Sequence, residues 1–224
     1  MNSYAVLAEG FEHLSYPLGR VPAAEGAVFY ERNERFVMLP ANSHSEAEMA
    51  VASADSLSEH ASFPVGLVAD SNGRVFIVCR PKGRFSSAES GAPLPSGMPA
   101  EERASFCRTV IRRLAMLHTG GFCCGGISPG EVEFSGGEAK LLNPSKISAA
   151  SDSDPLYYEA VATLRSLYGS GFARKSELGR LAQEYVSYSP VSRHAVLGHL
   201  AAKGVRTAPA KALCEHALRL AAYF

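Results

Sequence analysis

The sequence predicts an α+β protein with a small strand-rich N-terminal part and a mainly helical C-terminal part. Short aromatic and β-branched runs dominate up to residue 81, and helical periodicity runs from residue 100 to the end. Between them, residues 82–99 concentrate glycine, proline and serine, which is typical of a connection rather than of an element. We therefore expect an N-terminal unit over 1–81, a connecting segment over 82–99 and a helical unit over 100–224.

The N-terminal part predicts the order β-β-α-β-β. The runs GAVFYE (Gly26–Glu31) and RFVMLP (Arg35–Pro40) read as a hairpin. The following stretch, Ser45–Ala61, carries Ala, Met and Leu at helical spacing, and Ser45 is the expected N-cap. A second hairpin is expected where FPVGLVAD and RVFIVCRP flank Asn72-Gly73, because this dipeptide adopts the tight turns that join antiparallel strands.

The C-terminal part begins with one long predicted helix that ends at Gly120-Gly121. Its apolar residues fall on one face: Phe106, Val110, Ile111, Leu114 and Leu117. A short hairpin is expected next, with EVEF and AKLLN joined by SGGE, and four helices follow from about Tyr157. The last of them, PAKALCEHALRLAAYF, is amphipathic, and we expect its apolar face to pack into the core.

Charge and hydropathy exclude several classes of partner. The 22 basic and 22 acidic residues balance, so we expect neither nucleic-acid nor anionic-membrane binding. No apolar run approaches the roughly 20 residues that cross a bilayer. The first residues lack a basic stretch and include Glu9 and Glu12, unlike a secretory signal, so we expect a cytoplasmic protein.

The cysteines are odd in number and scattered, which argues against a disulfide framework. They are Cys79, Cys107, Cys123, Cys124 and Cys214. The adjacent pair has no C-x-x-C spacing and no second ligand pair nearby. We therefore expect buried structural thiols rather than a metal or redox site.

The segment between residues 117 and 146 resembles the protein-kinase-like superfamily. LHTGGF (Leu117–Phe122) matches the helix end that precedes the catalytic loop of that superfamily. CGGI (Cys124–Ile127) stands where the family has His-Arg/Gly-Asp-Leu, and SPGEV (Ser128–Val132) where it has Lys-Pro-x-Asn-Ile. KLLNPS (Lys140–Ser145) matches the strand that runs into Asp-Phe-Gly.

The resemblance extends from about Leu18 to Gly204 and implies a two-lobed kinase-like fold, with a β-rich N-lobe holding one helix and a helical C-lobe. Leu18-Gly19 and Gly26–Val28 resemble a worn glycine-rich loop, although Pro22 favours an ordinary connection there. Phe36–Leu39 resembles the third strand. The short segment after Asn143 is similar to compact archaeal and bacterial kinases of the Bud32/RIO type.

The charged groups that the family uses for phosphoryl transfer are absent at the matching positions. Leu39 or Met38 stands in place of the phosphate-binding lysine, and Gly126 in place of the aspartate base. Asn143 replaces the metal-binding aspartate, and Glu131 replaces the asparagine that binds a second metal. The resemblance therefore implies a pseudokinase with no metal, cofactor or small-molecule substrate, acting as a scaffold or allosteric module. Its expected partner is a protein, either an active kinase or a second copy of the chain.

An alternative keeps some chemistry through migrated acids. Glu131 and Glu133, two residues apart on an expected strand, should point the same way and could hold a cation together with Asn143. Such a site would make the chain an atypical phosphotransferase or an ATP sensor. We expect instead that both glutamates are solvent-facing strand residues.

Other charged residues have structural interpretations. Glu46 or Glu48 could be the acid that pairs with the missing lysine, but a solvated carboxylate at the helix start is expected. Asp152 or Asp154 could brace the backbone of the loop. His118 is expected to be a hydrogen-bonded histidine at the helix end, and three late histidines have no assigned role: His194, His199 and His216.

Overall fold

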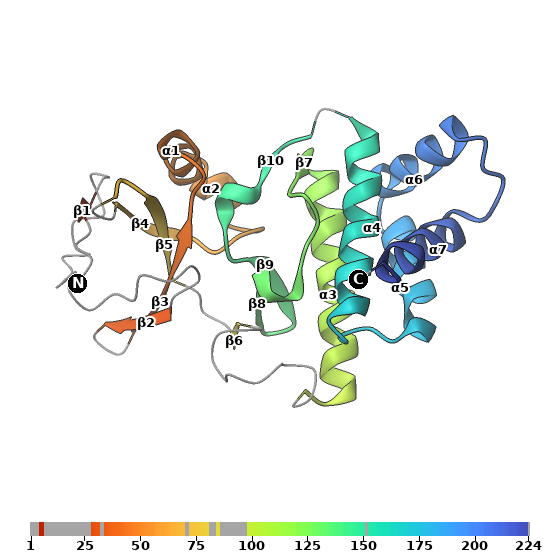
Figure 1. Ribbon diagram of the computed structural model, residues 1–224, viewed down its shortest axis with the longest axis horizontal. Helices are drawn as coiled ribbons and strands as arrows, with labels where there is room; N and C mark the ends of the chain where they lie inside the picture. Colours follow the sequence, from red (N-terminus) through yellow and green to blue (C-terminus); the bar gives the residue numbers. More distant parts are fainter. Residues whose placement is uncertain are drawn as a thin grey trace.

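The computed structural model describes residues 5–6, 28–31, 34–69, 72–80, 84–85, 98–150 and 152–223. Strands and two short helices form the N-terminal half, and helices dominate the C-terminal half (Figure 1). A small hairpin, β8–β9, lies between the sheet and the helices. The predicted mixture of a strand-rich and a helical part is therefore confirmed.

The N-terminal half is built on a five-stranded antiparallel sheet with the order β1-β4-β5-β3-β2. Both predicted hairpins are present. Strands β2 (Val28–Glu31) and β3 (Glu34–Pro40) form the first, and β4 (Pro64–Ala69) and β5 (Val75–Cys79) form the second. The short edge strand β1 (Ala5–Val6) was not predicted.

The predicted helix over 45–61 is two helices, α1 (His44–Ala52) and α2 (Ala54–Leu57), which meet at Ser53. The prediction of Ser45 as N-cap was wrong. Ser43 has the extended backbone of an N-cap, and its hydroxyl accepts a hydrogen bond from the Glu46 N–H at 3.2 Å. The helix therefore begins one residue before Ser45.

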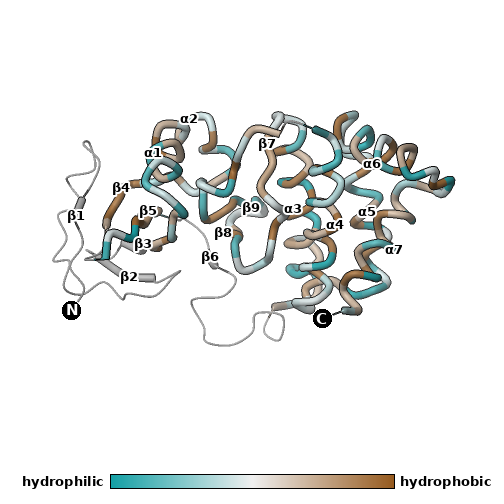
Figure 2. The backbone as a smooth tube through the Cα atoms, turned by 45° about the horizontal axis from the view of Figure 1, so that its top comes forward, coloured by the Kyte–Doolittle hydropathy of each residue, from teal (hydrophilic) through white to brown (hydrophobic). Residues whose placement is uncertain are grey.

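The sheet buries apolar side chains on both faces. One cluster combines β3, β5 and α1 and includes Val37, Leu39 and Ile77; the other includes Phe36 and Met38. Leu142, which follows β9, also belongs to the first cluster. A residue of the C-terminal half thus completes the hydrophobic core of the sheet. Figure 2 shows the strongly hydrophobic course of β4 in this layer.

The C-terminal half is organised around α3 (Ala100–Thr119), and all five residues predicted for its inner face are buried. After α3, β7 (Phe122–Cys123) pairs with β10 (Ser148–Ala149). The predicted hairpin is confirmed as β8 (Val132–Ser135) and β9 (Glu138–Leu141). Two 3-10 turns flank it: η3 (Pro129–Glu131) and η4 (Pro144–Lys146).

The four predicted helices after residue 150 are confirmed. They are α4 (Ser153–Gly169), α5 (Lys175–Tyr188), α6 (Pro190–Ala202) and α7 (Pro209–Ala221). Ala212, Leu213 and Ala217 of α7 are buried in the main core, as predicted for its apolar face.

Most of the predicted connecting segment 82–99 lies outside the described residues. Within it, β6 (Arg84–Phe85) pairs with β8. Part of the segment expected to be a linker therefore forms a strand of the small sheet.

The segment between α2 and β4 attaches the two halves to each other. Ala61 pairs with Leu141 of β9, and the Leu141 N–H donates to the His60 carbonyl at 2.8 Å. On the next residues, the Ser62 N–H donates to the Leu141 carbonyl, and Lys140 Nζ donates to the Ser58 carbonyl at 2.6 Å. Backbone pairing, rather than side-chain contact alone, fixes the register between the halves.

Arg113, buried on α3, adds a third element to this junction. Its Nε donates to the Ala139 carbonyl at 2.6 Å, and its Nη1 lies 3.3 Å from His60 Nδ1. A guanidinium group has no acceptor, so Nδ1 of His60 must be the unprotonated, accepting nitrogen. Burial and the neighbouring Arg113 charge lower the pKa of His60, which favours this neutral form.

Three of the five cysteines are buried, as predicted: Cys79, Cys107 and Cys124. Burial raises the pKa of each thiol, that of Cys107 to about 12, so these groups stay protonated. Cys123 and Cys214 are partly exposed. Among the described residues, no helix has the length and hydropathy of a membrane span.

The His60–Arg113 contact predicts a dependence of stability on pH. Because burial holds the pKa of His60 below its ordinary 6.5, the unfolded chain takes up this proton first as the pH falls. The stabilisation is complete above pH 6.5 and declines below it. His60→Asn keeps an acceptor near Nδ1 but does not titrate, so its free energy of unfolding should fall less between pH 7 and 5. Urea unfolding at both pH values measures this. If the free energy of unfolding fell by the same amount in both proteins, the prediction would be contradicted.

Candidate functional site

The segment from Cys124 to Glu131, whose sequence resembles a catalytic loop without its charges, is held by a carboxylate on α4. Glu159 accepts hydrogen bonds from the N–H groups of Cys124, at 2.9 and 3.0 Å, and Gly125, at 2.6 Å. Four residues further along α4, Thr163 Oγ1 accepts from the Ile127 N–H at 2.8 Å. Three backbone N–H groups within four residues of the loop are therefore fixed by two side chains of one helix.

The prediction that Asp152 or Asp154 braces this loop was wrong. Asp152 is the N-cap of α4, and Asp154 contacts His199 Nδ1 at 3.0 Å. The brace is Glu159, which lies further along the helix on its buried side. The signal in the sequence was a carboxylate among the apolar residues of an amphipathic helix, where a charge is retained only when it is paired.

His118, at the end of α3, completes the network. Its Nε2 lies 3.0 Å from Glu159 Oε2, and its Nδ1 lies 2.7 Å from the hydroxyl of Tyr185 on α5. The expectation of a fully hydrogen-bonded helix-end histidine is confirmed. Helices α3, α4 and α5 thereby meet in one buried polar cluster.

The electrostatics of Glu159 favour its ionised form. Burial alone would raise the pKa of the carboxyl group, but the hydrogen bonds from His118, Cys124 and Gly125 outweigh it, and the pKa is lowered. A buried carboxylate with three donors is stable as an anion. The cluster therefore serves to hold the loop, and its carboxylate faces backbone N–H groups instead of a substrate space.

Gly126 stands where the family resemblance implies a proton-accepting aspartate. Its φ is +92°, in the left-handed region that disfavours side chains. A Cβ atom here would lie 3.0 Å from Ala162 Cβ and 3.2 Å from the Glu159 carbonyl oxygen on α4. The close approach of loop and helix therefore leaves no room for an acidic side chain in this conformation.

Asn143, at the position of the metal-binding aspartate, uses its side chain locally. Its Oδ1 accepts from Ser145 twice, from the backbone N–H at 3.0 Å and from the hydroxyl at 2.7 Å. Its Nδ2 donates to the Pro40 carbonyl at the end of β3, at 3.3 Å. Asn143 thus caps η4 and links it to the sheet of the N-terminal half.

Glu131 and Glu133 do not form a common site, contrary to the expectation of a shared strand face. Glu131 lies in η3, where it accepts from the Ser128 N–H and forms an ion pair with Lys146. Glu133 lies on β8 and is only 6 % exposed, so the expected solvent-facing position was also wrong. Its carboxylate accepts a hydrogen bond from the Ser62 hydroxyl at 2.7 Å. Ser62 belongs to the segment that joins the two halves.

The position of the missing lysine is apolar. Leu39 is 8 % exposed and packs in the cluster that contains Ala47 and Ala50 of α1 and Leu142. Met38 lies in the cluster on the opposite face. The helix acids point elsewhere: Glu46 accepts from the Asn42 N–H, and Glu48 pairs with the exposed His44. Both behave as the expected carboxylates of a helix start.

The residues of the resembling glycine-rich loop, Gly19, Pro22 and Gly26 among them, lie outside the described part of the chain. Within the described ranges, no group of three or more His, Cys, Asp or Glu side chains is arranged to hold a metal ion.

The brace predicts a large effect of Glu159→Gln. The amide keeps one acceptor but turns N–H groups toward buried donors, so we expect a loss of about 3 kcal/mol in the free energy of unfolding. Urea denaturation measures it. Glu101→Gln, an exposed acid in the first turn of α3, is the matched control and should cost less than about 1 kcal/mol. Similar losses in both variants would refute the role of Glu159.

Substitutions at two adjacent glycines distinguish the effect of steric crowding on stability from that of backbone strain. Gly125 and Gly126 both have positive φ, but a Cβ at Gly125 meets no atom within 4 Å. Gly125→Ala should cost only the left-handed strain of about 1–2 kcal/mol. Gly126→Ala adds overpacking against α4 and should cost about 2–4 kcal/mol. Thermal unfolding by circular dichroism ranks the two; an equal loss would show that α4 does not confine the loop.

Comparison with known proteins gives a structural likeness but no match in sequence. No protein-family model matches the chain, and no curated protein matches it in sequence. The crystal structure of the Mycobacterium tuberculosis PknI kinase domain is similar over 89 % of this chain and 93 % of that chain, with 13 % identity and a TM-score of 0.41. A likeness of this size carries no argument on its own, and the interpretation of the site depends on its internal geometry.

Proposed function

We propose that this chain is a catalytically inactive kinase-like protein, a pseudokinase, that works as a scaffold or allosteric module. One observation carries the proposal: the loop at 124–131 is held in place by hydrogen bonds, but the positions that would need charged side chains are sterically blocked, apolar or engaged in other contacts. Gly126 has no room for an acid, Leu39 is packed in an apolar cluster, and the Asn143 oxygen accepts from Ser145. A positioned frame without charge stabilisation does not accelerate phosphoryl transfer.

The order of elements supports the kinase-like interpretation and the two-lobed arrangement. An antiparallel sheet with a helix after its β3 strand precedes the long helix α3. The braced loop, the hairpin β8–β9 and the turn at Asn143 follow in the order that the family resemblance implies. Leu142 and Asn143 then connect the hairpin to the sheet, as a contact between two lobes would.

A protein partner is the proposed ligand of this module, either an active kinase or a second copy of the chain. Fold alone does not fix a function, so the proposal rests on the chemistry of the site. The migrated-acid alternative loses support from the geometry, because Glu131 is engaged by Ser128 and Lys146 while Glu133 faces Ser62. These two carboxylates have separate partners on separate elements.

Nucleotide addition tests the proposal. We expect no rise in melting temperature with ATP, alone or with Mg²⁺ or Mn²⁺, and no transfer of labelled phosphate to the chain or to a general protein substrate. An active kinase in parallel validates the assay. A metal-dependent rise together with transfer that Asn143→Ala abolishes would overturn the pseudokinase. A rise without transfer would instead assign ATP sensing, since a ligand that binds the folded state raises its stability.

A further inference from the structure

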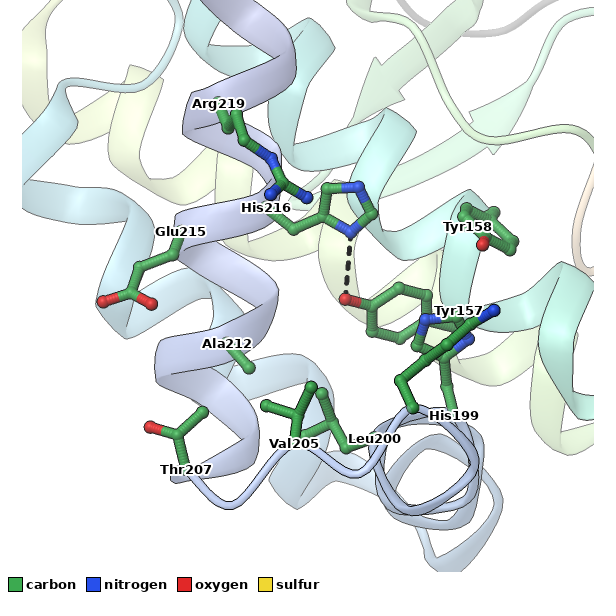
Figure 3. A pocket seen from close by; sticks show the side chains of 11 residues that line it. Tyr157, Tyr158, His199, Leu200, Val205, Thr207, Ala212, Glu215, His216 and Arg219 are labelled. Atoms are coloured by element: carbon green, nitrogen blue, oxygen red, sulfur yellow. Dashed lines mark hydrogen bonds between the residues drawn. The ribbon is translucent and has the colours of Figure 1, made fainter.

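A second site is suggested by a cavity in the helical half, away from the loop. It lies between α4, α6 and α7 and has a volume of about 530 Å³, within the range of small-molecule sites (Figure 3). Its aromatic and cationic lining combines Tyr157, Tyr158, His199, His216, Lys203 and Arg219.

The aromatic wall of the cavity is held rigidly. Tyr157 and His199 stack with ring centroids 3.8 Å apart and an interplanar angle of 10°. The Tyr157 hydroxyl lies 3.0 Å from His216 Nδ1, as Figure 3 shows, so one residue from each of three helices meets here. Asp154 contacts the Nδ1 atom of His199 at 3.0 Å and sets the orientation of its ring. These contacts satisfy the buried members of the wall without a ligand.

Tyr158, by contrast, remains open. It is 48 % exposed, and its ring approaches His199 and His216 edge-on, at interplanar angles of 79° and 75°. An exposed aromatic ring beside a preformed aromatic wall provides a surface on which another flat ring can pack at little entropic cost.

The lining of the cavity carries more positive than negative charge, with two cations against one acid. Neither Lys203 nor Arg219 has an ion-pair partner among the described residues. The acidic lining residue, Glu215, lies 3.8 Å from Lys211 on the same helix. Burial and the nearby Arg219 charge lower the pKa of His216, so its ring is neutral near pH 7. The two long side chains therefore give the cavity its charge.

We propose that this cavity binds a small aromatic anion, with its ring against the tyrosine–histidine wall and its acidic group attracted by Lys203 and Arg219, the two cations of the lining. An aryl phosphate or carboxylate has both features, since lysine and arginine recognise such groups through charge-assisted hydrogen bonds. This site is independent of the proposed pseudokinase function, because none of its lining residues belongs to the degenerate loop.

Phenyl phosphate is the probe. Calorimetric titration should show binding, and inorganic phosphate and phenol, which each lack one feature, should bind at least about 10-fold more weakly, since one such interaction contributes about 1.4 kcal/mol or more. Lys203→Gln and Arg219→Gln should each weaken phenyl phosphate about 10-fold. Tyr158→Leu, which keeps apolar area without a ring, should weaken it about 3-fold or more.

Arg193→Gln is the matched control, because Arg193 is an exposed cation of α6 that lines a different cavity. It should leave the affinity unchanged. The proposal is overturned if phenyl phosphate does not bind at about 10 mM, which nearly fills any site with a Kd of about 1 mM. It is also overturned if inorganic phosphate binds equally well, or if Arg193→Gln weakens binding as much as Arg219→Gln does.

Discussion

The buried carboxylate of Glu159 is the interaction on which the helical half depends. It takes hydrogen bonds from two backbone N–H groups of the loop and from His118, which in turn reaches Tyr185. Removing such a charge from water is costly unless every acceptor position is filled. Helices α3, α4 and α5 must therefore pack in one arrangement that brings all donors to the same point, and the loop takes its shape from that arrangement.

The two halves are joined by a different kind of contact. Between Ala61 and Leu141 the connection is backbone pairing, while Leu142 contributes apolar area to the sheet and Arg113 adds hydrogen bonds from α3. The backbone pairing sets the register, Leu142 supplies hydrophobic burial, and the hydrogen bonds of Arg113 connect the junction to the helical core. Glu133 and Ser62 extend the same joint, which explains why a carboxylate on a short strand is buried.

Periodic features were predictable from the sequence because they depend only on neighbours along the chain. The five inner residues of α3 and the β8–β9 hairpin are examples. The contacts of Glu159 with the loop, and of Tyr157 with His199 and His216, depend on how the helices pack. The spacing of these residues in the sequence does not indicate that packing. The prediction that Glu131 and Glu133 point the same way was wrong for a local reason. The 3-10 turn η3 ends at Glu131 and the strand β8 begins at Val132, so the alternation of side chains along a strand does not relate the two glutamates.

The brace on the loop also governs how the sequence can change over time. Glu159 accepts hydrogen bonds from backbone N–H groups, which every residue except proline possesses. Residues 124 and 125 are therefore held in place from α4 and not by their own side chains. The side chain at residue 124 can therefore change without loss of this geometry, whereas Gly125 and Gly126, which have positive φ, and Glu159 cannot be replaced freely. A loop held in this way keeps its backbone shape when a side chain that makes no contact with the helix changes.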